Sequence, residues 1–257
     1  MRILVSNDDG IHSKGLRDLV KALSAHHEVY VCAPMSEKSS YSHSVTYWRV
    51  VNKAKEEVVE GAKGAWSVEA TPADCVYYGL NYFVKDGVNL VISGINKGEN
   101  VSSDVIYSGT VGAAQEGLLM QVPAMALSLC SYTSQDYSPV TTFIESLIDM
   151  YMRDTDKLHY VCNVNVPSIA PSDVKGIQVT TLDGWKDYTK EVTGKKEEDG
   201  TIWLTCQNSF ACIQDSTHTL DKDYEAVKQG YISVTPIGVD LVESALLDRM
   251  KLLFKQD

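Results

Sequence analysis

The chain has 257 residues, enough to bury a large hydrophobic core as one domain with an appendage or as two modest domains. Its 34 acidic and 23 basic residues give a formal net charge of −11, which argues against a nucleic-acid polymer or an anionic membrane as the main partner. No run approaches the roughly 20 apolar residues of a membrane span, and the N-terminus leaves no room for a signal peptide before the first polar loop. The six cysteines form no Cys-x-x-Cys pair, so we expect buried thiols and a cytoplasmic location.

Strand and helix patterns alternate through the first two-thirds of the chain. Apolar strands are predicted at residues 3–6, 29–33, 66–70, 90–93, 124–129 and 160–166. Helices are predicted at residues 14–25, from Pro72 after the cap Thr71, at 111–120, and at 139–152 after the cap Ser138. Because these strands are too apolar to have a wet face, the alternation predicts an α/β fold with a mostly parallel sheet and helices on both sides.

The pattern changes after Pro167. Residues 180–219 are polar and turn-rich, which predicts an extended β-hairpin arm with residues 201–206 in one limb. A further strand is predicted at 231–236 and an amphipathic helix at 239–254. We therefore divide the chain into a catalytic core, residues 1–180, and an arm with a returning strand and helix, residues 181–257, within one functional unit. So long an excursion from a compact domain favours packing on a neighbouring subunit.

Polar groups follow four of the predicted strands, at the edge where open α/β sheets bind ligands. In chain order they are Asn7, Asp8 and Asp9, then Ser39, then Thr71 and Asp74, then the run from Ser93 to Asn100. The adjacent carboxylates of Asp8 and Asp9 would repel each other by roughly 4 kcal/mol at 4 Å and an effective dielectric constant near 20, unless a cation lies between them. Carboxylate, hydroxyl and amide oxygens are ligands for hard cations such as Mg²⁺, Mn²⁺ or Ca²⁺, whereas zinc favours Cys and His.

A phosphate site is predicted where residues 108–110 lead into the helix at 111–120, because free N–H groups at a helix N-terminus favour phosphate. The two aspartates would neutralise a divalent cation, so a phosphate dianion needs the helix terminus and further donors, for which the sequence offers Asn100, Lys14, Lys38 and Lys97. Each motif alone also has a structural explanation, as a solvated Asp-Asp-Gly turn or a helix cap. Their convergence from separate strand ends favours a site.

Several other phosphate-handling sites are excluded by spacing. The chain has no P-loop, no Gly-x-Gly-x-x-Gly fingerprint and no Gly-x-Ser-x-Gly elbow. Asp8 and Asp9 are adjacent and not spaced as the Asp-x-Asp of aspartyl-phosphate phosphatases. The third predicted strand ends without the phospho-acceptor aspartate that a receiver domain requires.

Six segments resemble the signature blocks of the survival protein SurE family of metal-dependent 5′/3′-nucleotidases. They are SNDDGIH (6–12), AP followed by Ser39 (33–39), TPADCV (71–76), SGIN (93–96), DVIYSGTV (104–111) and GYISVTP (230–236). The resemblance implies a Rossmann-like three-layer core and an arm exchanged between subunits of a homodimer or homotetramer. It also implies release of phosphate from nucleoside 5′- and 3′-monophosphates, with short polyphosphate as a further candidate substrate.

Site residues are carried over from the same resemblance. It assigns one divalent cation per subunit, Mg²⁺ or Mn²⁺, to Asp8, Asp9, Ser39 and Asn96. It assigns phosphate contacts to Asn100, Ser108, Gly109 and Thr110, and we also expect Asn7 to contact the substrate. Asp8 and Asp9 are the expected catalytic residues, and either could accept the proton of the attacking water.

One block departs from the family. Where the family commonly has Asp-Arg after Ala-Pro and Ser-Gly a few residues on, this chain has Met35-Ser36 and Ser39-Ser40. Two alternative functions remain open from the sequence. One is a nucleotide sensor that uses the same pocket without catalysis, and the other is an assembly protein in which the arm is the primary element.

Overall fold

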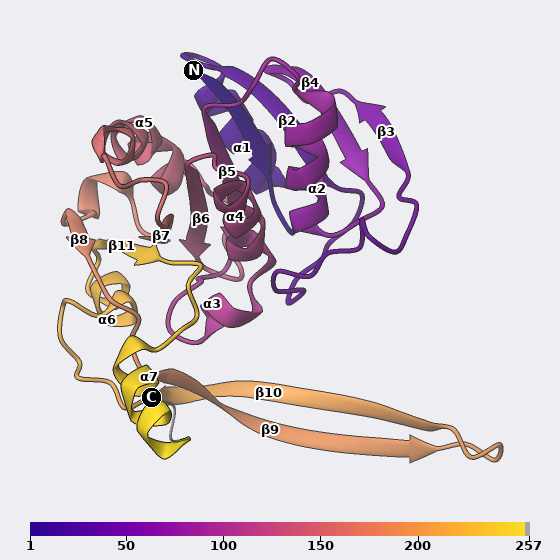
Figure 1. The fold of residues 1–257 in the computed structure, drawn as a ribbon, viewed down its shortest axis with the longest axis vertical. Helices are drawn as coiled ribbons and strands as arrows, with labels where there is room; N and C mark the ends of the chain where they lie inside the picture. Colours follow the sequence, from indigo (N-terminus) through magenta and orange to yellow (C-terminus); the bar gives the residue numbers. More distant parts are fainter. Residues whose placement is uncertain (255–257) are drawn as a thin grey trace.

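The structure, a computed structural model, describes residues 1–254, apart from the side chains at positions 244 and 245. Its centre is a nine-stranded sheet with the strand order β3-β4-β2-β1-β5-β6-β7-β11-β8 (Figure 1). The strands are β1 (Arg2–Ser6), β2 (Glu28–Pro34), β3 (Ala54–Glu57), β4 (Ala62–Val68), β5 (Leu90–Lys97), β6 (Ala124–Cys130), β7 (Val161–Pro167), β8 (Ile177–Val179) and β11 (Ile232–Ile237). A separate antiparallel hairpin contains β9 (Trp185–Lys196) and β10 (Ile202–Gln214).

Helices cover both faces of this sheet, which gives three layers (Figure 1). The helices of the described residues are α1 (Lys14–Leu23), α2 (Pro72–Tyr78), α3 (Asp104–Tyr107), α4 (Gly109–Leu119), α5 (Ser138–Arg153), α6 (Asp223–Lys228) and α7 (Ser244–Leu253), with short segments η1 (Gly79–Phe83) and η2 (Pro171–Asp173). Helix α7 lies near the base of the hairpin and not on the sheet (Figure 1). Helices α1 and α5 pack together on one face, and α2 and α4 pack together on the other. The apolar core is therefore split into two clusters by the sheet.

The six central strands, from β4 to β7 in the sheet order, are parallel, whereas β3 and β11 run antiparallel to their neighbours β4 and β7. Strands β1, β2, β5, β6 and β7 are mostly buried because both faces are covered by helices, whereas β4 is only partly buried. The predicted α/β class is confirmed. Strand β1 pairs with β2 on one side and with β5 on the other. Successive strands are therefore added in one direction from β1 up to β4 and in the other direction from β5 onward. Ligand crevices form at such a switch point, between β1 and β5.

The hairpin of β9 and β10 extends away from the body of the protein (Figure 1). This confirms the predicted hairpin, and the limb predicted at residues 201–206 lies inside β10. The division at residue 181 stays a prediction, and β11 from the second part pairs with β7 and β8 inside the main sheet. Within residues 1–254, no helix is long and apolar enough to cross a membrane.

Some element limits differ from the predictions. Strand β5 continues past Gly94 to Lys97, and the last helix begins at Ser244 instead of residue 239. Helix α5 begins at Ser138 itself, with Tyr137 in the cap position. The prediction of six buried cysteines was wrong for three of them. Cys206 and Cys212 are exposed on the hairpin and Cys130 is half-buried, although all six thiols are free.

Candidate active site

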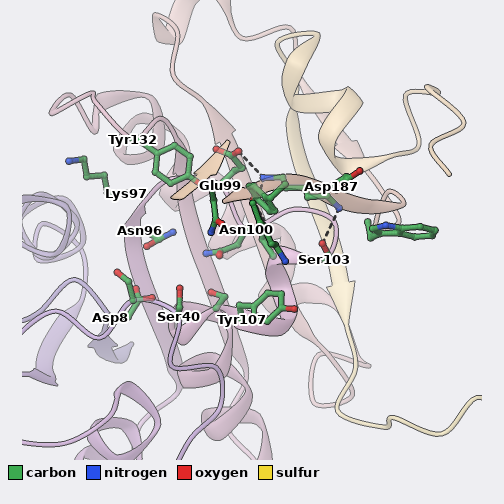
Figure 2. Close-up of a pocket in the computed structure, with 18 residues that line it drawn as sticks. Asp8, Ser40, Asn96, Lys97, Glu99, Asn100, Ser103, Tyr107, Tyr132 and Asp187 are labelled. Carbon is green, nitrogen blue, oxygen red and sulfur yellow. Dashed lines mark hydrogen bonds and ion pairs between the residues drawn. The ribbon is translucent and has the colours of Figure 1, made fainter. Parts of the chain in front are cut away.

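A cavity of about 770 Å³ opens beyond the carboxyl ends of β1 and β5 and reaches the base of the hairpin (Figure 2). This volume is within the range of small-molecule sites. Five of the predicted site residues line it: Asp8, Ser39, Asn96, Asn100 and Ser108. The other predicted residues, Asn7, Asp9, Gly109 and Thr110, are not among its lining residues.

The carboxylate of Asp8 lies between the end of β1 and the first turn of α4. Only 4% of Asp8 is exposed, and Oγ1 of Thr110 donates a hydrogen bond of 2.6 Å to its Oδ1. Helix α4 approaches this closely because its first residue is a glycine: a Cβ at Gly109 would lie 2.9 Å from the Cβ of Asp8. Burial raises the pKa of Asp8 to about 6, although the hydrogen bond from Thr110 opposes the rise. Ionisation of the Asp8 carboxyl group therefore costs more free energy at this buried position than in water.

Asp9 and Asn7 flank Asp8 in different environments. Oδ2 of the half-buried Asp9 accepts a hydrogen bond of 3.3 Å from the backbone N–H of Lys97, at the end of β5. Burial also raises the pKa of Asp9. The amide of Asn7 donates to the carbonyl of Gly10 at 3.0 Å and to Oγ of Ser13 at 2.8 Å. Asn7 thus holds the turn that presents the two aspartates, and its predicted contact with the substrate stays a prediction.

Ser39 lies in an exposed loop that follows β2. Its hydroxyl donates to a carboxylate oxygen of Glu37 at 2.7 Å, which leaves the serine oxygen available as an acceptor. The loop reaches the site through its backbone, because the N–H of Lys38 donates to the carbonyl of Asp8 at 2.7 Å. Further along, the N–H of Ser42 donates to the carbonyl of Tyr107 at 3.0 Å.

Two buried carboxylates anchor the far end of this loop. His43 contacts Glu116 of α4 at 2.8 Å, and Glu116 is only 4% exposed. Thr46 donates to Asp74 from its N–H at 2.8 Å and from its hydroxyl at 2.6 Å. Asp74 also forms the capping box of α2 with Thr71, as expected of a first-turn residue. These loop contacts were not predictable from local sequence patterns, because the paired residues lie 28 and 73 positions apart in the chain.

The segment after β5 supplies the two asparagines. The amide N–H of Asn96 donates to the carbonyl of Gly98 at 2.9 Å, which leaves its carbonyl oxygen as a potential ligand. The side chain of Asn100 donates to Oγ of Ser128 at 2.9 Å, and its backbone carbonyl accepts from Asn163 and Asn165 at 2.9 and 3.0 Å. These buried partners on β6 and β7 fix Asn100 at the cavity wall.

Ser108 is the N-cap of α4, since its hydroxyl accepts a hydrogen bond of 3.0 Å from the N–H of Val111. The serine of this motif therefore does act as a helix cap. A phosphate contact would use the remaining N–H groups of the first turn. Of the three lysines named as further donors, only Lys97 lines the cavity. Lys14 forms an ion pair with Asp18, and Lys38 lies over the ring of Tyr41.

The base of the hairpin forms the wall opposite Asp8. Lys186 is paired with Glu99 at 2.8 Å and with Asp104, and only 2% of its side chain is exposed. The hydroxyl of Tyr188 donates to Asp104 at 3.0 Å. Burial alone would lower the pKa of Lys186, but the two carboxylates hold it above its ordinary value. Because these partners are 82 to 87 residues apart in the chain, no local sequence pattern indicated the ion pairs.

The donor set at this site suits a hard divalent cation. No group of three or more His, Cys, Asp or Glu residues suited to a metal occurs within residues 1–254. The predicted ligands are instead two carboxylates, a serine hydroxyl and an asparagine carbonyl. Two partly or fully buried carboxylates with raised pKa values lie next to each other here, and a cation is the group that would offset their charge.

Comparisons with known proteins identify the family of this chain. The model of the family described as Survival protein SurE matches residues 3–189. A protein named 5′-nucleotidase SurE from Syntrophomonas wolfei is 35% identical over 100% of this chain and 96% of its own length. One of the same name from Pelotomaculum thermopropionicum is 38% identical over 99% of this chain and 96% of its own.

The same family appears among solved structures. The crystal structure of the SurE protein from Aquifex aeolicus superposes with a TM-score of 0.81 at 29% identity, and the match covers 99% of this chain and 100% of that one. The resemblance drawn from the six sequence blocks is thereby confirmed, and with it the expectation of a nucleotidase enzyme. This chain belongs to the Survival protein SurE family.

Proposed function

We propose that this protein hydrolyses nucleoside 5′-monophosphates, and also 3′-monophosphates and short polyphosphate, and that it requires one divalent cation. The names of its relatives support the first substrate class. The observation that carries the proposal is the buried carboxylate of Asp8, which is pressed against the first turn of α4 and opens to a cavity of substrate size. A charge placed there at such cost is typical of a functional site.

The cation, Mg²⁺ or Mn²⁺, would be held by Asp8, Asp9, Ser39 and Asn96. When bound, such an ion supplies Lewis-acid polarisation of the phosphoryl group and makes water more acidic. Asp8 and Asp9 would keep the ion in place, and either could accept a proton from the attacking water. Ser39 would contribute its oxygen while its hydroxyl donates to Glu37.

The remaining residues would bind and orient the phosphate. The free N–H groups of the first turn of α4 carry the partial positive charge of the helix N-terminus, which would stabilise negative charge on phosphoryl oxygens. Gly109 allows this turn to lie directly against Asp8, so the phosphate and the cation ligands are adjacent. Asn100, fixed by Ser128, Asn163 and Asn165, lies at the next part of the wall and can contribute a further contact.

The test is phosphate release from 5′-AMP, 5′-GMP, 3′-AMP and tripolyphosphate, each with Mg²⁺, with Mn²⁺ and with EDTA. We expect turnover of the 5′-monophosphates with at least one metal and none with EDTA. Binding of AMP without turnover under any metal would contradict the proposal and favour the nucleotide sensor. Turnover that is unchanged by EDTA would refute the cation requirement.

We further propose that the hairpin joins subunits into a homodimer or homotetramer in the cytoplasm. It presents exposed apolar side chains along both strands: Val192, Ile202, Trp203, Leu204 and Phe210. The whole arm cannot be removed to test this, because residues 185–188, 190 and 208 line the cavity. The appropriate variant replaces residues 192–206 with a short turn between the paired residues Glu191 and Gln207. Light scattering should then report a smaller assembly than for the intact chain.

A further inference from the structure

Two exposed tyrosine rings line the cavity on either side of the predicted phosphate contact Asn100 (Figure 2). Tyr132 follows β6 and is 59% exposed, and Tyr107 ends α3 and is 62% exposed. Neither residue takes part in the proposed chemistry. Large exposed aromatic side chains within a cavity indicate a binding surface for a flat, apolar ligand group.

The ring of Tyr132 is fixed against the backbone beside the site. It rests on Gly98, which has a φ of +114°, and a Cβ at position 98 would collide with the ring. Gly98 lies between Asn96 and Asn100 in the chain, and its carbonyl accepts the hydrogen bond from Asn96. The ring is therefore held at the segment that supplies one proposed cation ligand and one proposed phosphate contact.

The aromatic ring, and not the hydroxyl, is the feature that this position presents. The hydroxyl of Tyr132 makes no hydrogen bond to any residue in the part of the chain that the structure describes. A tyrosine keeps its proton at neutral pH, since its ordinary pKa is about 10, so the ring is uncharged. A neutral ring that is packed beside Gly98 and has much of its surface exposed is suited to stacking.

Tyr107 lies beside the first turn of α4, where the phosphate contacts are proposed. Its carbonyl accepts the N–H of Ser42 at 3.0 Å, and the next residue, Ser108, caps α4. Only Ser108 therefore separates Tyr107 from the first residue of α4. Both rings line the same cavity. Tyr132 lies beside the segment 96–100, which supplies proposed cation and phosphate contacts, and Tyr107 directly precedes the proposed phosphate contact Ser108.

We propose that Tyr132, with Tyr107 across the cavity, forms the surface on which the nucleobase of the substrate stacks. This inference rests on the proposed nucleotidase function and names specificity-determining residues for it. Every nucleobase has a π face, so stacking would accept different bases and favour any nucleotide over a phosphomonoester that lacks a base. The stacking contributes to substrate binding and leaves the reacting phosphate untouched.

The experiment compares AMP with ribose 5-phosphate, which has the same phosphoester and lacks the base. Wild-type enzyme, Tyr132→Ala, Tyr132→Phe and Tyr107→Ala are assayed on both, with Tyr82→Ala as a control at an exposed tyrosine (65%) outside the cavity. We expect Tyr132→Ala to raise KM for AMP about tenfold, the scale of base–aromatic stacking, and to leave kcat and the rate on ribose 5-phosphate near the wild-type values. Tyr107→Ala should act in the same direction, and Tyr132→Phe should match the wild type.

Three results would overturn the inference. Equal losses on AMP and ribose 5-phosphate would mean that the ring only supports the segment 96–100. An unchanged KM for AMP in both alanine variants would mean that the base does not touch the rings. A wild-type enzyme that hydrolyses ribose 5-phosphate as efficiently as AMP would show that the base contributes nothing. Failure of the wild type on every phosphoester would instead refute the proposed function itself.

Discussion

Replacing Asp8 by asparagine should remove activity and change how the stability of the metal-free protein depends on pH. The carboxyl of Asp8 has its pKa raised by burial from an ordinary 3.8 to about 6. Between these values the folded protein holds a proton that the unfolded chain releases. Stability of the wild type therefore falls as pH rises through this window, and the full effect above pH 6 is about 3 kcal/mol.

The asparagine variant lacks this titration, and its carbonyl can still accept the hydrogen bond from Thr110. Burial of the new amide N–H groups adds a cost, but that cost does not change with pH. The useful quantity is therefore the difference in stability between variant and wild type. Between pH 5 and pH 7.5 this difference should move in favour of the variant by about 1.5 kcal/mol, or about 3–6 °C in melting temperature for a chain of this size.

The assay is thermal unfolding in EDTA across this pH range, with Glu60→Gln as the control at an exposed carboxylate. Addition of Mn²⁺ at pH 7.5 should then raise the melting temperature of the wild type and leave that of Asp8→Asn unchanged, because a ligand stabilises only the state that binds it. A difference that stays flat with pH, or that moves against the variant as pH rises, would refute the buried-carboxylate argument. A variant with wild-type turnover in excess Mg²⁺ or Mn²⁺ would refute the ligand assignment.

Three further substitutions test other parts of the site. Gly109→Ala puts a methyl group 2.9 Å from the Cβ of Asp8, so kcat with AMP should fall at least tenfold while circular dichroism stays native. Glu116→Gln weakens the contact with His43 that anchors the Ser39 loop, so the Mn²⁺ concentration for half-maximal activity should rise several-fold, whereas kcat at saturating metal should change little. Lys186→Met leaves two carboxylates facing each other without a cation, so denaturant unfolding should show a loss of about 3–5 kcal/mol at pH 7.5. An unfolding free energy equal to that of the wild type would contradict the ion-pair explanation.

The core of the fold was predictable because its strands and helices carry short-range patterns. Apolar runs located six of the central strands, and Pro72 after Thr71 located the start of α2. The ends of strands and helices that depend on tertiary contacts were harder to predict. Residues 94–97 continue β5 because β6 provides hydrogen-bonding partners. The exposure of Cys206 follows from its place on a hairpin that projects from the body of the protein (Figure 1).

The same distinction applies to the site. Sequence placed Asp8, Ser39, Asn96, Asn100 and Ser108 at one edge, and the structure brings all five to one cavity. The residues that hold them in place were not found, because an isolated glutamate or lysine gives no sign of a partner far along the chain. Glu116 and Lys186 are such residues, each paired across more than 70 positions. A polar residue whose partner is distant becomes visible only in three dimensions.

The position of Lys186 also connects the arm to the chemistry. Its ion pairs with Glu99 and Asp104 fasten the base of the hairpin to the segments on either side of Asn100. If the hairpin joins subunits as proposed, the subunit contact and the cavity wall are parts of one element, which this buried ion pair holds to the core. The hypothesis of an assembly protein and the hypothesis of an enzyme are therefore compatible for this chain. Truncation at the tip, beyond the residues that line the cavity, should separate them, because it removes the exposed apolar strands and keeps the wall that Lys186 holds.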